Sequence, residues 1–163
     1  MPLLPMNMRT FFCFVVIALG CIDAPAKSRR IGNYDFHLSR SGHKVALIIR
    51  NAPFESSKHS HGYNENIGPL VDGRKAYGAE SIPRTQIKSI VLYFDGRPIK
   101  VSRWLYSDCY NPNLESEYVK LRLARNRQTV FVTMDGADGA GAYTVVWVLK
   151  RNGRHSRFFK PAF

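Results

Sequence analysis

Apolar and polar residues alternate along much of the chain, which is typical of β-strands with one buried face. Tyr34, Phe36 and Leu38, for example, occupy every second position of their segment. Segment 119–123 is rich in residues that also suit a helix, but its alternation favours a strand. Segment 142–150 is apolar on both faces, which predicts a central strand. The other segments with a strand pattern are 45–49, 87–94, 98–105, 129–134 and 155–159.

Turn motifs separate these segments. Ser41-Gly42, Asp95-Gly96 and Asn152-Gly153 are pairs that tolerate positive φ and close tight hairpins. Pro98 cannot donate a backbone hydrogen bond, so we expect its segment at a strand end or a sheet edge. About eight strands without a convincing helix predict an all-β domain, either an antiparallel β-sandwich or a small barrel.

Segment 51–84 interrupts the strand pattern. It contains repeated glycines and prolines and shows no sustained alternation, although 73–77 is a candidate for one short irregular strand. We therefore expect a long irregular loop at about 51–84. Loops of this length inside a compact domain are often functional or disordered, which makes this one a candidate surface for a protein partner.

The N-terminal segment has the features of an export signal. Arg9 precedes the uncharged run 11–22, which is shorter than the roughly 20 apolar residues that span a bilayer. Ala24-Pro25-Ala26 has the small-x-small pattern of a cleavage site. This interpretation predicts a signal peptide at 1–26, a single β domain at 27–163 and no membrane span after cleavage.

A second interpretation of the same segment leads to a lipoprotein. Ala18-Leu19-Gly20-Cys21 resembles a lipobox, in which Cys21 would become the lipidated first residue. Both interpretations predict an exported protein, either released to the periplasm or medium or anchored to the membrane through lipid at Cys21.

Basic residues are twice as numerous as acidic ones. The chain has 24 Lys and Arg against 12 Asp and Glu, a formal net charge of +12. Such a surplus attracts anionic polymers, and aromatic side chains among the cations suit stacking against sugars or bases. A solvated basic surface without a ligand is the alternative. The candidate binding residues are Arg97, Lys100, Arg103, Trp104, Tyr106, Lys150, Arg151, Arg154 and Arg157.

Two short motifs are candidates for metal binding. His59 and His61 stand two residues apart, so an extended backbone would direct both rings toward one ion such as Zn²⁺. Asp135 and Asp138 lie in a glycine-rich stretch and could offer oxygen ligands to Ca²⁺. Incidental loop histidines and a tight turn between strands are the simpler interpretations, so we predict no required cofactor.

The remaining chemistry is sparse. Cleavage before Lys27 would leave Cys109 as the only cysteine, so no internal disulfide would form, and no neighbouring base marks it as a nucleophile. No Gly-x-Ser-x-Gly motif is present. The leading hypothesis is an exported, non-enzymatic β-sandwich module that binds an anionic envelope or extracellular ligand. The alternative is a metal-binding protein or metal-dependent enzyme with its site in 51–84.

Overall fold

The computed structural model describes residues 31–137 and 139–160, and this part of the chain is all-β. The predicted signal peptide and Cys21 lie outside the described residues, as does Asp138. No helix within the described ranges is long and apolar enough to cross a membrane.

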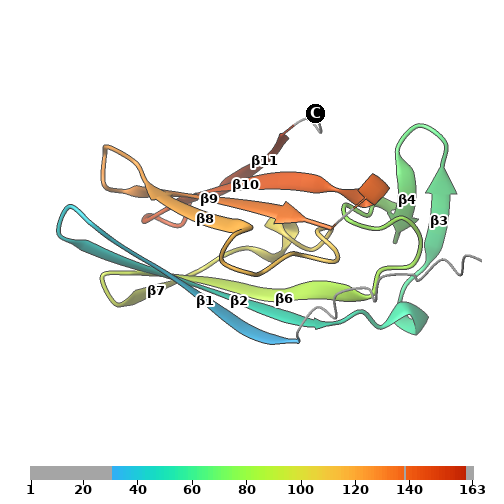
Figure 1. The fold of residues 1–163 in the computed structure, drawn as a ribbon, viewed down its shortest axis with the longest axis horizontal. Helices are drawn as coiled ribbons and strands as arrows, with labels where there is room; N and C mark the ends of the chain where they lie inside the picture. The colour runs from blue at the N-terminus through green and yellow to red at the C-terminus, as the bar shows by residue number, and fades with distance from the viewer. Residues whose placement is uncertain (1–30, 138, 161–163) are drawn as a thin grey trace, which may run out of the picture.

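Two four-stranded antiparallel sheets form the body of the domain, stacked as two layers in Figure 1. The strand orders are β1-β2-β6-β7 and β11-β10-β9-β8, so each sheet is a meander of strands that are neighbours in space. The first sheet consists of β1 (Gly32–Arg40), β2 (His43–Pro53), β6 (Thr85–Phe94) and β7 (Arg97–Lys100). The second consists of β8 (Val119–Leu123), β9 (Thr129–Gly136), β10 (Tyr143–Lys150) and β11 (Ser156–Lys160).

The core lies between the two sheets. Leu47 and Leu92 of the first sheet and Val132 and Trp147 of the second are all 0% exposed and belong to one apolar cluster. These residues occupy alternate positions of their strands, which confirms the two-residue period as the signal for the buried face. The outward-facing Val146 of β10 is also buried, as expected for a central strand that is apolar on both faces.

The predicted turn chemistry is also confirmed. Asp95 and Gly96 adopt φ of 50° and 79° and join β6 to β7 by the two-residue connection that such pairs favour. Strand β7, which contains Pro98, lies at the edge of its sheet, where a missing N–H leaves no ladder hydrogen bond unmade.

The predicted loop 51–84 contains more strand than the sequence indicates. Strand β2 extends to Pro53, and a separate sheet of order β3-β4-β5 follows, made of β3 (His61–Asn64), β4 (Gly68–Val71) and β5 (Arg74–Lys75). All four residues of β3 are exposed, so no buried face imposes an alternating pattern on this hairpin. Figure 1 shows it projecting beyond one end of the sandwich.

A 3-10 helix and a loop connect the two sheets between β7 and β8. This connection includes η2 (Arg103–Leu105) and the buried residues Asp108 and Cys109. The indole Nε1 of Trp147 donates to the backbone oxygen of Leu105 at 2.8 Å, which ties the connection to the core.

Three arginine contacts fix the same connection from outside. Both guanidinium nitrogens of Arg157 on β11 donate to the Asp108 carboxylate, with Nη2 to Oδ2 at 2.6 Å. Arg74 on β5 reaches the same carboxylate at 3.3 Å. Asp108 therefore joins the second sheet and the small sheet through one buried charge.

Tyr143 fixes the end of the sandwich next to the small sheet. Its hydroxyl donates to the backbone oxygen of Tyr110 at 3.2 Å. Its ring packs against the backbone of Gly78 and Gly136, where an added Cβ would approach ring carbons to 2.6 and 2.3 Å. Both glycines are thus required by close packing.

Candidate binding surface

Four hairpin turns meet at one end of the sandwich, on the left in Figure 1. The β1–β2 and β6–β7 turns are joined by a hydrogen bond from the Asp95 amide to the Lys44 oxygen at 2.8 Å. The β8–β9 and β10–β11 turns are joined by a bond from the Arg151 amide to the Gln128 oxygen at 2.9 Å. The Arg151 guanidinium lies 5.1 Å from the ring centroid of Phe94, which links the two pairs.

These turns bring together eight basic side chains, which we call the basic hairpin end. All eight are exposed, and none of them forms a salt bridge with another described residue. The basic hairpin end consists of Arg40, Lys44, Arg97, Arg125, Arg127, Lys150, Arg151 and Arg154.

One carboxylate, that of Asp95, stands within these four turns. It accepts a hydrogen bond from Nδ1 of His43 at 2.9 Å and another from the Lys44 amide at 3.0 Å. The bond from His43, assisted by the Lys44 amide, lowers the pKa of Asp95 below its usual value. Asp95 therefore stays ionised but serves the turn and does not pair with the arginines.

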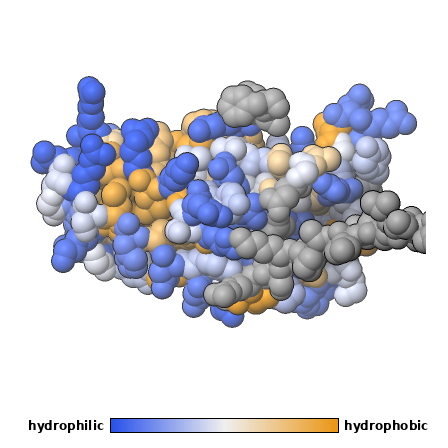
Figure 2. Space-filling view, in the orientation of Figure 1, coloured by the Kyte–Doolittle hydropathy of each residue, from blue (hydrophilic) through white to orange (hydrophobic). Residues whose placement is uncertain are grey.

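The basic hairpin end also borders apolar surface. Figure 2 shows hydrophilic side chains projecting around a hydrophobic area at this end of the molecule. Partly buried apolar side chains of β1 and β8, Leu38 and Leu121, lie at the adjoining edges of the two sheets. Crowded like charges above apolar surface attract counterions strongly, because the protein interior beneath them has a low dielectric constant.

The structure sorts the predicted binding residues into two groups. Arg97, Lys150, Arg151 and Arg154 belong to the basic hairpin end, and Lys100 lies beside it on β7, exposed. The remaining predicted residues, Arg103, Trp104, Tyr106 and Arg157, lie on η2, the residue after it and β11.

Two members of the second group do not offer a free surface. Tyr106 is 4% exposed, and burial raises the pKa of its phenol. Arg157 is half-buried and donates to Asp108 and to the Leu105 oxygen, so its charge is already paired. Trp104 is 55% exposed and Arg103 is exposed, so these two remain accessible on η2.

The two histidines proposed for zinc have other partners. His59 Nδ1 donates to Asp72 at 2.7 Å, while His61 Nε2 donates to the Ser56 oxygen at 3.0 Å. The rings contact Phe54 differently, one stacked at 4.8 Å between centroids and the other edge-on at 5.9 Å. Throughout residues 31–137 and 139–160, no group of three or more His, Cys, Asp or Glu is placed to hold a metal ion. The zinc site stays a prediction.

The proposed calcium loop is described only in part. Asp135 lies at the end of β9 and accepts a hydrogen bond from the Thr144 hydroxyl at 2.7 Å. This bond crosses between paired residues of β9 and β10 and explains Asp135 as part of the strand pair. The calcium site likewise stays a prediction.

Cys109 is fully buried. Its burial, reinforced by the adjacent Asp108 carboxylate, raises the pKa of the thiol far above its usual value. The thiol is thus neutral and enclosed, which fits packing and not nucleophilic attack.

Sequence reasoning overlooked Arg40 and Lys44, which belong to the basic hairpin end. Each flanks the Ser41-Gly42 turn, but neither stands near the other basic clusters in the sequence. The available signal was that alternate turns of a meander lie at the same end of the sheet. Comparisons of the chain with protein-family models, with curated proteins and with solved structures find no match.

Proposed function

We propose that the protein is an exported, non-enzymatic β-sandwich module whose basic hairpin end binds an anionic polymer of the cell envelope or extracellular medium. The observation that supports this proposal is the convergence of eight exposed cations from four separate turns onto one end of the domain. A surplus of charge alone would not require that convergence.

The clustering has a physical consequence. Eight like charges on adjacent turns repel one another, and only the Asp95 carboxylate stands among them. A flexible polyanion relieves this repulsion and releases its own condensed counterions, so binding gains free energy that falls as salt rises. A small anion would neutralise only one or two of the cations. A polymer matches the spread of the surface over four turns.

Heparin is a suitable probe for this surface. We expect the apparent dissociation constant to rise steeply with NaCl concentration, with a logarithmic slope of about 4 if about six cations contact the polymer. A variant with Arg97→Gln, Arg125→Gln and Arg154→Gln removes one cation from each of three turns. It should lower that slope by about 2 and weaken binding roughly tenfold to a hundredfold.

A matched variant separates a built surface from the general charge of the protein. Arg50→Gln, Arg84→Gln and Lys88→Gln remove the same charge from exposed positions of β2, β6 and the residue before it. This variant should bind heparin within about threefold of the native chain. Equal weakening by both triple variants, or binding that ignores salt, would overturn the proposal.

A further inference from the structure

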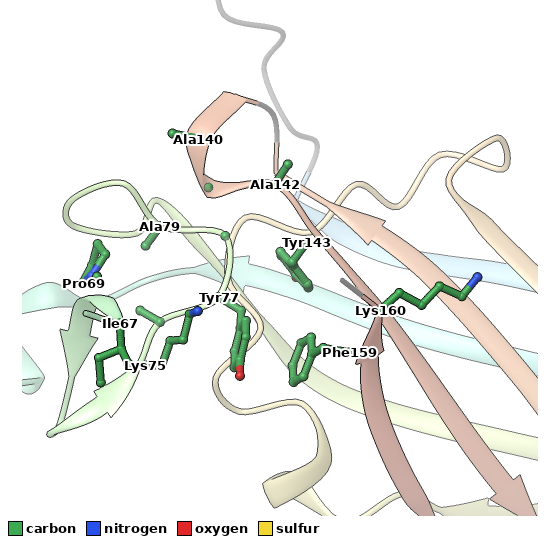
Figure 3. A pocket seen from close by; sticks show the side chains of 14 residues that line it. Ile67, Pro69, Lys75, Tyr77, Ala79, Ala140, Ala142, Tyr143, Phe159 and Lys160 are labelled. Carbon is green, nitrogen blue, oxygen red and sulfur yellow. The ribbon is translucent and has the colours of Figure 1, made fainter. Parts of the chain in front are cut away.

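A pocket of about 250 Å³ lies between the small sheet and the β9–β10 turn (Figure 3). That turn joins the ends of β9 and β10 that lie opposite the β8–β9 and β10–β11 turns. The pocket therefore lies at the other end of the sandwich from the basic hairpin end, and a ligand there would be independent of a polymer bound at the hairpins.

Small and aromatic residues shape the pocket. Ala79, Ala140 and Ala142 line it and leave room that longer side chains would fill. Tyr77 and Phe159 close one side, with their rings stacked at 3.7 Å between centroids. Figure 3 shows the two rings side by side below the β9–β10 turn. The walls are thus largely apolar and held by packing.

One positive charge is directed to this space. The Lys75 ammonium lies 4.9 Å from the centroid of the Tyr77 ring, on the side away from Phe159 in Figure 3. Lys160 also lines the pocket, but its side chain extends away from the other labelled residues. The described lining contains no acidic side chain, and the nearby Glu80 carboxylate accepts the Gly141 amide at 3.2 Å.

We infer that this pocket binds a small organic monocarboxylate with a flat apolar body. The Lys75 ammonium would pair with the carboxylate, while the alanine and aromatic walls would receive the body. The volume lies below the usual range for drug-sized ligands, which limits the ligand to about ten non-hydrogen atoms. Phenylacetate has this size and chemistry and serves as the probe.

Titration of ¹⁵N-labelled protein with phenylacetate tests the inference. We expect saturable shifts of the amide signals of Gly78, Ala79, Gly141 and Ala142, and none at the basic hairpin end. The neutral phenylacetamide should bind at least about tenfold more weakly, because it lacks the charge that Lys75 would pair with. The same spectra show whether each variant is folded.

Two lysines of the same pocket provide a matched pair of variants. Lys75→Gln should weaken phenylacetate binding about tenfold, whereas Lys160→Gln should change it less than twofold. The inference is overturned by equal effects of the two variants, by equal binding of phenylacetamide, or by shifts confined to the basic hairpin end. Tighter binding of glucuronate than of phenylacetate would also overturn it, because a polar sugar would then be preferred over an apolar body.

Discussion

Replacing Asp108 by Asn tests how the buried ion pair holds the domain together. The Asp108 side chain is 9% exposed and that of Arg157 is 13% exposed, so water screens their interaction poorly. Asn keeps the shape of Asp but removes its charge, and its amide group turns a donor toward a guanidinium that needs acceptors. The result is a charge left buried without a counterion.

The expected cost follows from this burial. Removing one partner of a buried pair costs about 3–5 kcal/mol. Arg157 retains its bond to the Leu105 oxygen at 3.0 Å and some exposure, which places the expected value near the lower limit, about 3 kcal/mol. For a domain of this size each kcal/mol lowers the midpoint of thermal unfolding by roughly 3–5 °C. Asp108→Asn should therefore lower the midpoint by about 9–15 °C.

Circular dichroism and the fluorescence of buried Trp147 both follow this transition. Asp35→Asn is the matched control, because it removes the same charge from an exposed position on β1 and should shift the midpoint by less than about 2 °C. The double variant Asp108→Leu with Arg157→Leu should lose less stability than Asp108→Leu alone, since no charge stays buried. A midpoint for Asp108→Asn equal to that of Asp35→Asn would refute the reasoning.

Two further predictions concern packing and pH. Gly136→Ala places a Cβ 2.3 Å from the Tyr143 ring and should cost about 1–3 kcal/mol in urea unfolding, whereas Gly62→Ala, with its nearest neighbour at 3.8 Å, should cost less than about 1 kcal/mol; equal costs would contradict the packing. Bonds from His59 and His43 lower the pKa of Asp72 and Asp95, so the unfolded chain takes up protons first as pH falls. Their stabilisation is full above about pH 4 and is lost below it, so a variant with both changed to Asn should show a shallower loss of midpoint between about pH 5 and 3; an unchanged pH profile would contradict it.

Most of the sandwich could be predicted because its strands bury one face. Trp147 and Leu47 occupy alternating positions, and Asp95-Gly96 marks its turn directly in the sequence. Strand β3 could not be predicted, since all its residues are exposed and its stability comes from pairing with β4. The Asp108–Arg157 pair was also hidden, because the two residues are separated by 49 positions and meet only through the tertiary fold.

The candidate surface depends on both levels. Each basic cluster is visible in the sequence, but its position relative to the others follows from topology. Alternate turns of a meander lie at the same end of the sheet, which places the β1–β2, β6–β7, β8–β9 and β10–β11 turns together. Tyr106, by contrast, follows exposed Trp104 by two residues yet is buried, because η2 turns the chain inward between them.

The same topology separates charge along the molecule. The four turns at one end contain eight cations and one carboxylate, whereas the connection from β2 to β6, on the other side of that topology, contains Glu55, Glu65, Asp72 and Glu80. An anionic polymer approaching from a distance would be steered toward the hairpins, since long-range attraction follows the net charge of each end. The end with the small sheet would then remain free, and its pocket would stay open to a ligand while the polymer is bound.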